Sequence, residues 1–239
     1  MIIKTLITRS SKQLNAVPHQ PISDNTNHQI MDYRKDIFEK IAFIKAHYDS
    51  ASYEVKMKEI IFNKCLSNAE ITAFERKFSI SLPDDYKYFL SEIGNGGFGC
   101  GYGLKPLEET VIDFKLEDKP IINLIQPFRY TKEWNEEWVY KIDWDNDEHP
   151  TLKQVDNYMD VHHIFGCLQI AHFGHGCTYL LVVSGSEKGH VWFDGRADYS
   201  GIFPELVNEQ KQTFIQWYLN WLNVEIEYIK KSLTSQASC

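Results

Sequence analysis

The sequence predicts an α+β fold in which a central antiparallel sheet is packed by N-terminal helices and a long C-terminal helix. Two observations support this prediction. Apolar residues follow a helical period near the start and at the end of the chain, and alternating strand patterns lie between these regions. Runs of helices and runs of strands that do not alternate along the chain are typical of α+β proteins.

Composition and charge limit the classes of function. The chain has 239 residues, of which 43% are hydrophobic and 14% aromatic, so it can bury a sizeable core. A net charge of −8 argues against direct binding of nucleic acid, whereas an acidic surface attracts a basic protein. The five cysteines match no disulfide framework, and no apolar run is long enough to cross a membrane. We therefore expect a cytoplasmic protein with reduced thiols.

The first residues are predicted to form a flexible arm. Residues 1–30 are mostly polar, contain Pro18 and Pro21, and show no sustained period. From Tyr33 the apolar spacing predicts a helix, and a second helix is expected over Tyr53–Cys65. We expect residues 31–239 to form a single domain.

Two further helices carry explicit start signals. Ser67 and Glu70 are spaced as a capping box, and apolar residues follow them at helical intervals. The run Leu82-Pro83-Asp84-Asp85 places proline and acids where a helix begins. That helix is predicted to end before Gly94, which stands at the C′ position.

The glycine-rich loop Gly94–Gly103, GNGGFGCGYG, contains the spacing G-x-G-x-x-G of a dinucleotide-binding turn. Such a turn must follow a strand and open a helix, because the helix N-terminus holds the pyrophosphate. Here the loop follows a helix and precedes the extended stretch Tyr102–Leu107. We therefore predict that Gly94 caps the helix and that the other glycines supply positive φ angles for a tight turn.

The second half of the chain supplies the predicted sheet. Two of its runs, joined by the turn Ser184–Gly189, form an expected hairpin. The final helix is predicted to begin at Pro204 and to carry an aromatic stripe. The predicted strands cover Ile164–His172, Thr178–Val183 and His190–Asp194.

A group of histidines and cysteines raises the question of a metal site. Cys167, His172, His175 and Cys177 have suitable side chains, but their spacing matches no standard zinc motif. The simpler interpretation is a strand that ends in a glycine-rich turn. We expect no metal, cofactor or catalytic residue. A metal-dependent enzyme stays as an alternative that would use His162, His163, His172, His175 and Cys177.

An acidic, tryptophan-bearing segment is the candidate binding surface. From Lys105 to Glu148 the chain has twelve acidic and six basic residues, which accounts for −6 of its net charge. Acids steer the approach of a basic partner, and exposed tryptophans can anchor it. In the alternative interpretation the tryptophans belong to the core and the acids only solvate the surface. The candidate partner-binding residues are Trp134, Glu136, Glu137, Trp138, Asp143, Trp144, Asp145, Asp147 and Glu148.

Several motifs resemble the SUKH superfamily, which contains bacterial toxin-immunity proteins and fungal regulators of cell-wall assembly. The resemblance starts with ITAFERKF at Ile71–Phe78, continues with LPDDYKYFL at Leu82–Leu90 and with Asn95-Gly96-Gly97, and ends on the GHVWFD run at Gly189–Asp194. It covers roughly residues 65–230. The long acidic insertion at about 108–162 falls outside the pattern.

This resemblance implies an α+β domain that binds a protein and has no catalytic centre. It implies mainly structural roles for the recurrent motif residues, with Leu82 and Tyr86 packing a helix on the sheet; these residues are Leu82, Pro83, Tyr86, Gly96, Gly97 and Trp192. Our leading hypothesis is an immunity protein that blocks a toxin with a basic surface, of the nuclease type, without touching nucleic acid or membrane. A regulatory or scaffolding module is the alternative.

Overall fold

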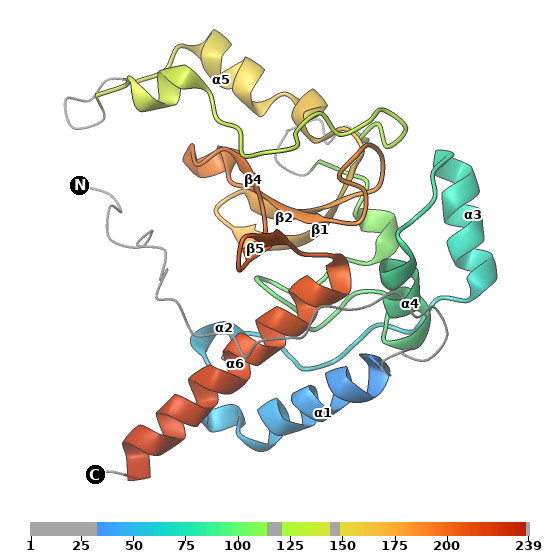
Figure 1. Cartoon of the computed structure of the whole chain (residues 1–239), viewed down its shortest axis with the longest axis vertical. Helices are drawn as coiled ribbons and strands as arrows, with labels where there is room; N and C mark the ends of the chain where they lie inside the picture. The colour runs from blue at the N-terminus through green and yellow to red at the C-terminus, as the bar shows by residue number, and fades with distance from the viewer. Residues whose placement is uncertain (1–32, 114–120, 144–148, 238–239) are drawn as a thin grey trace. The chain divides into compact units, whose positions relative to one another are not determined.

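A four-stranded antiparallel sheet organises the chain in the computed structural model, which describes residues 33–113, 121–143 and 149–237 (Figure 1). The arm predicted at 1–30 lies outside the described residues. The strands follow one another in the order β1-β2-β3-β4, and the predicted α+β class is confirmed. Their bounds are Cys167–Gly174 (β1), Cys177–Val182 (β2), Val191–Asp194 (β3) and Ile202–Pro204 (β4).

Helices lie on both sides of this sheet in Figure 1, with α1, α2 and α6 on one side and α5 on the other. In the part of the chain that the structure describes, none of them is long and apolar enough to cross a membrane. The α-helices are α1 (Tyr33–Ala46), α2 (Tyr53–Lys56), α3 (Asn68–Phe78), α4 (Asp84–Glu92), α5 (Leu152–Met159) and α6 (Phe214–Ala237). Single 3₁₀ turns are η1 (Tyr48–Ser50), η2 (Leu107–Glu109), η3 (Glu137–Tyr140), η5 (Val161–Ile164) and η6 (Arg196–Asp198).

The start of the last helix differs from the prediction. The stretch predicted to be helical from Pro204 instead completes β4 and then forms a two-stranded hairpin of Leu206–Val207 (β5) and Gln210–Lys211 (β6). The helix begins only at Phe214. Trp192 on β3 pairs with Pro204, so register with the neighbouring strand decides the conformation here.

Both faces of the sheet are buried by aromatic contacts. Tyr179 on β2 pairs with Phe193 on β3, and its ring packs 5.0 Å from that of Trp217 on α6. On the opposite face Trp192 is fully buried and packs 5.1 Å from the ring of Phe128. Side chains alternate between the faces of a strand, so the insertion that carries Phe128 closes the side that α6 leaves open.

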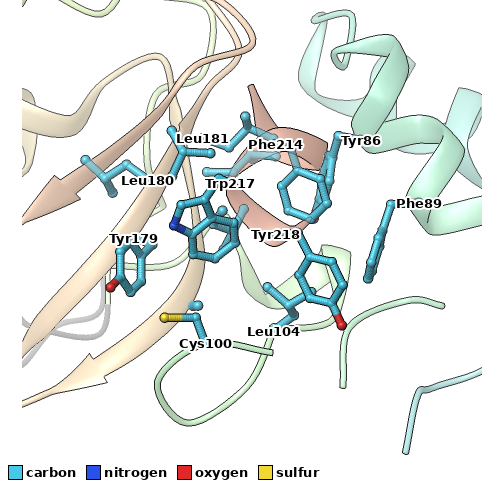
Figure 2. Close-up of a cluster of buried hydrophobic side chains, with 14 of the residues drawn as sticks. Tyr86, Phe89, Cys100, Leu104, Tyr179, Leu180, Leu181, Phe214, Trp217 and Tyr218 are labelled. Carbon is cyan, nitrogen blue, oxygen red and sulfur yellow. The ribbon is translucent and has the colours of Figure 1, made fainter. Parts of the chain in front are cut away.

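The core between α4, α6 and the sheet is shown in Figure 2. The ring of Tyr86, which was predicted to pack a helix on the sheet, lies 4.6 Å from Phe214 of α6. Phe89 also contacts α6, through Phe214 and Tyr218 at 5.1 Å each. Helix α4 therefore packs against α6. Leu82, the second residue of that prediction, is buried in the same hydrophobic core.

The glycine-rich loop is a point of close backbone approach. Gly96, Gly97, Gly101 and Gly103 have the predicted positive φ angles, whereas the prediction is wrong for Gly99, whose φ is not positive. The N–H of Gly94 donates to the carbonyl of Phe89 at 3.0 Å, so its capping role is confirmed. Its φ is not positive, however, and a glycine is needed because a Cβ there would lie 2.7 Å from Phe62 Cβ.

The chain before α3 explains this crowding. The helix expected over Tyr53–Cys65 ends at Lys56, and Phe62 forms a bridge with Gly97 instead. The N–H of Phe98 donates to the carbonyl of Ile61 at 2.8 Å. Tertiary pairing with the glycine loop thus draws these residues into an extended conformation that their local spacing does not predict.

Each edge of the sheet is covered. At β1, Leu104 forms a bridge with Ala171, and the N–H of Lys105 donates to Ile170 O at 2.9 Å. The stretch predicted as a strand over Tyr102–Leu107 thus pairs only through isolated bridges. At β4, Trp134 pairs with Ile202. Covered edges cannot pair with other chains.

Candidate functional site

The acidic insertion is anchored to the β4 edge through a tryptophan. The N–H of Trp134 donates to the carbonyl of Ile202, and the N–H of Ile202 donates back to Trp134 O, each at 2.8 Å. Earlier in the insertion, the N–H of Phe128 donates to Ser184 O at 2.9 Å. These backbone bonds hold the described part of the insertion against the sheet, so side chains there have defined positions.

A stack of aromatic rings forms around Trp134. Its ring lies 5.0 Å from Tyr130, 4.3 Å from His163 and 5.5 Å from Tyr158. Trp138, four residues later in the chain, makes an edge contact with Tyr158. Such aromatic contacts contribute about 0.5–1.5 kcal/mol each beyond the area they bury. Both tryptophans are half-buried, so the two interpretations of them, core and surface, each hold in part.

A shallow pocket of about 350 Å³ opens beside this stack, and we call it the aromatic pocket. Its walls combine aromatic rings with a few polar groups, as is common for binding sites. Glu136 and Arg129 supply one carboxylate and one guanidinium. The lining residues are Arg129, Tyr130, Trp134, Glu136, Asn157, His162 and His163.

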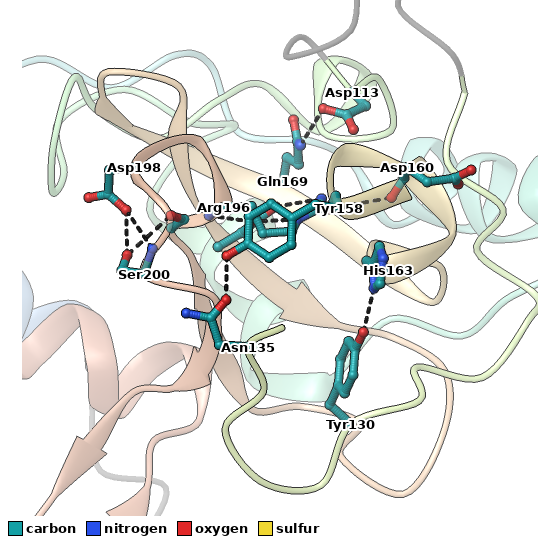
Figure 3. Close-up of polar contacts among 12 residues, drawn as sticks. Asp113, Tyr130, Asn135, Tyr158, Asp160, His163, Gln169, Arg196, Asp198 and Ser200 are labelled. Atoms are coloured by element: carbon teal, nitrogen blue, oxygen red, sulfur yellow. Dashed lines mark hydrogen bonds and ion pairs between the residues drawn. The ribbon is translucent and has the colours of Figure 1, made fainter. Parts of the chain in front are cut away.

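A buried ion pair anchors the end of α5, the helix that carries the lining residue Asn157, and Figure 3 labels Arg196 of this pair. Arg196 and Asp194 are both fully buried, and Arg196 Nε donates to Asp194 Oδ1 at 2.9 Å. Arg196 Nη1 then donates to the carbonyls of Tyr158 and Asp160, at 3.0 and 2.8 Å. One guanidinium therefore ties the end of α5 to the sheet.

Asn135 links the insertion to Tyr158 and Tyr199 through two side-chain hydrogen bonds. Its Oδ1 accepts a hydrogen bond from the Tyr158 hydroxyl at 2.6 Å, and its Nδ2 donates to Tyr199 O at 2.8 Å (Figure 3). Burial raises the pKa of the Tyr158 hydroxyl, which keeps this group a neutral donor. The ring of Tyr158 is thereby held where Trp134 and Trp138 pack.

His163 sits neutral beneath the pocket. Its Nε2 lies 3.0 Å from the carbonyl of Asn157, to which only a protonated nitrogen can donate, so Nδ1 is left to accept from the Tyr130 hydroxyl. Burial, reinforced by the charge of Arg196, lowers the pKa of His163 from 6.5 to about 4. A charged imidazole would lose the acceptor that Tyr130 uses.

We expect acid to destabilise the fold through His163. Between pH 6.5 and about 4 the unfolded chain binds a proton at this side chain that the folded chain does not. The stability that neutral His163 contributes is fully present above pH 6.5. As the pH falls toward 4, the free energy of unfolding decreases by about 3 kcal/mol. Urea unfolding of the wild type and of His163→Gln across this range measures the difference. A ring-proton NMR titration of His163 with a midpoint near 6.5 would contradict it.

The structure places five of the nine candidate partner-binding residues. Trp134 and Glu136 line the aromatic pocket together, while the Trp138 ring contacts Tyr158. Glu137 is exposed and forms an ion pair with Lys141 at 2.9 Å, and Asp143 is exposed as well. The other four, Trp144, Asp145, Asp147 and Glu148, lie outside the described residues.

Sequence reasoning missed two exposed apolar side chains beside this segment. Tyr140 is 76% exposed and Leu152 is 83% exposed, and in the sequence they flank residues 144–148. A capping box of Thr151 and Gln154 starts α5 next to Leu152, so its first turn could have been found from the sequence. The exposure of Leu152 had no such signal, because it depends on what α5 packs against.

The histidines and cysteine of the alternative metal site are not brought together. His172 pairs with Thr178 across β1 and β2, His175 lies in the turn with a φ of 49°, and Cys177 is buried. His162 and His163 stack 4.0 Å apart on η5. Among residues 33–113, 121–143 and 149–237, no three histidine, cysteine, aspartate or glutamate side chains are grouped as metal ligands.

Comparison with known proteins identifies the part of the chain that carries the fold. A model of the SMI1 / KNR4 family (SUKH-1) matches residues 65–218, which is more than half of the chain. The match starts just before α3 and ends inside α6, so it includes the glycine loop, the sheet and the acidic insertion. No curated protein sequence matches the chain significantly.

Proposed function

Because the chain belongs to the SMI1 / KNR4 family (SUKH-1), we propose that it is a cytoplasmic immunity protein that binds and neutralises a cognate bacterial toxin. It acts by stoichiometric blockade and not by catalysis. The favoured toxin is a nuclease-type effector, whose substrate-binding surface is basic. The observation that carries this proposal is the aromatic pocket, where half-buried Trp134 lies beside Glu136 within the most acidic part of the chain.

The pocket supplies a rigid anchor for such a partner. Trp134 is held by ring contacts on several sides and by two backbone hydrogen bonds. A pre-ordered aromatic side chain loses little conformational entropy when it is covered, so more of the contact energy appears as affinity.

The negative charge of the acidic segment raises the association rate and favours a basic partner. The segment from Lys105 to Glu148 carries −6, which would steer a basic surface toward the aromatic pocket. The exposed pair of Glu137 and Lys141 is no obstacle, since such surface pairs are worth at most about 1 kcal/mol and exchange partners readily.

Affinity capture from a lysate of the native organism, in low and in high salt, tests the proposed function. One basic protein retained in near-equal amount, and identified by mass spectrometry, would support it. Many weakly held proteins would favour a regulatory or scaffolding module instead. Loss of toxin activity in the presence of one equivalent of this chain is the decisive measurement, and an unaffected toxin would refute neutralisation.

Charge reversal should slow the association. We expect Glu136→Lys with Glu137→Lys to reduce the association rate for the captured protein about 10-fold or more at low salt, with a smaller effect at high salt. The matched control is Glu92→Lys with Glu209→Lys, which changes the net charge equally at exposed positions elsewhere. Surface plasmon resonance measures both. Equal slowing by the two pairs would show that only net charge matters, and no slowing would refute the patch.

A further inference from the structure

A second hollow lies on the opposite side of the sheet from α5. It is a groove of about 550 Å³ at the end of α1, around α2 and the stretch that follows it. Its apolar lining includes Tyr48, Met57, Ile60 and Ile61. Met57 is 62% exposed and Ile61 59% exposed. We call this feature the α2 groove.

More apolar surface adjoins the α2 groove. Tyr53, on α2, is 76% exposed. The Ser52 hydroxyl donates to Glu225 Oε1 at 2.8 Å, which places α2 beside the middle of α6, where Val224 and Tyr228 are half-exposed. Contiguous apolar patches on a protein surface mark interaction sites. These residues lie outside the family match at 65–218, so they add a surface to that common part.

The charges around the α2 groove are balanced. Lys45, Lys56 and Glu59 line it together with Lys58, which is already paired with Glu54 at 3.3 Å. Asp49 adjoins it because Lys56 Nζ donates to Asp49 O at 2.6 Å. The charges outside the Lys58–Glu54 pair are thus Lys45, Lys56, Glu59 and Asp49. All four side chains are exposed, and within the described ranges none of them forms an ion pair. Two positive and two negative groups are thus available to a partner that presents the same set.

A surface that complements itself suits a twofold dimer. In such an interface the same patch of each copy faces its counterpart, so a patch of one charge would repel and a mixed one can pair. The excess negative charge of the chain lies mainly between Lys105 and Glu148. Figure 1 shows α5, which follows that segment, across the sheet from α1 and α2. Copies that meet at the α2 groove therefore keep their acidic segments apart.

We propose that a second copy of this chain docks on the α2 groove. Met57 and Ile61 form the apolar centre of the interface, and Lys45 and Lys56 of each copy face Asp49 and Glu59 of the other. The dimer leaves the aromatic pocket open, so it is independent of the toxin-binding role.

Light scattering of the full chain across micromolar to millimolar concentrations tests the dimer. The mass should rise from 28.0 kDa toward twice that value. We expect Met57→Glu with Ile61→Glu to raise the dimer dissociation constant about tenfold or more. The control is Ile121→Glu with Ile125→Glu, at 66% and 61% exposure, which adds the same charge at similarly exposed apolar positions and should leave the constant unchanged.

Three outcomes would overturn the proposal. A chain that stays monomeric at every concentration would overturn it. This holds even if the Met57→Glu, Ile61→Glu variant no longer captured some other protein from the lysate. A dimer indifferent to the groove variant, or one weakened equally by the control, would do so too. Charge exchange supplies a second test: Lys45→Glu should weaken the dimer about threefold or more, and adding Glu59→Lys should restore it.

Discussion

Replacing Arg196 by methionine will lower the free energy of unfolding by about 3–5 kcal/mol, because it leaves the Asp194 carboxylate buried without its cation. Both side chains are fully buried, and Arg196 Nη2 donates to Asp194 Oδ2 at 2.9 Å in addition to the bond from Nε. The same change removes the donors to Tyr158 O and Asp160 O. The end of α5 should therefore loosen together with the aromatic pocket.

The ion pair can be tested with a double-mutant cycle followed by urea unfolding. Adding Asp194→Asn to Arg196→Met removes the isolated charge, so we expect it to restore about 1–3 kcal/mol rather than to cost more. Lys230→Met is the control, because it breaks a pair of the same 2.9 Å length to Glu227 at an exposed site and should cost less than about 1 kcal/mol. Additive losses in the cycle would contradict the pairing.

Gly97→Ala is expected to destabilise the fold by about 4 kcal/mol or more, which is among the largest effects of a single substitution. Gly97 has a φ of 113°, and a Cβ there would lie 2.5 Å from Ile61 O and 2.7 Å from Phe62 Cα. Its N–H and carbonyl also bond to Leu104, at 2.8 and 2.7 Å. The backbone on either side would have to separate to admit a methyl group.

Gly189→Ala separates crowding from backbone strain. Gly189 also has a positive φ, of 93°, but the nearest atom to a Cβ is 3.9 Å away. The free energy of unfolding of this variant should decrease by only about 1–2 kcal/mol, which is the cost of a left-handed φ for alanine. Thermal and urea unfolding compare the two, and hydrogen exchange at Phe98 reports the loop directly. Equal losses would show that close approach adds nothing at Gly97.

The parts of this fold that depend on neighbours in the chain could be predicted from the sequence. The capping box of Ser67 and Glu70 is present, because both partners lie within one helical turn. The phosphate-loop interpretation of Gly94–Gly103 was rejected because the loop follows a helix and precedes an extended stretch. The structure has the same order. The hairpin of β2 and β3 was predicted in the same way, from two alternating runs and the turn between them.

Only the tertiary structure decided the features that depend on distant partners. Phe62 is extended because Gly97 pairs with it, and Pro204 ends a strand because Trp192 lies opposite. Trp134 is half-buried because Ile202 holds its backbone and His163 packs on its ring. Sequence spacing describes a residue's own helix or strand, whereas burial of a side chain depends on elements that fold against it from elsewhere. The sequence by itself determined the α+β class, the helix starts and the acidic segment; the packed chain alone decided where a pocket and a groove open on its surface.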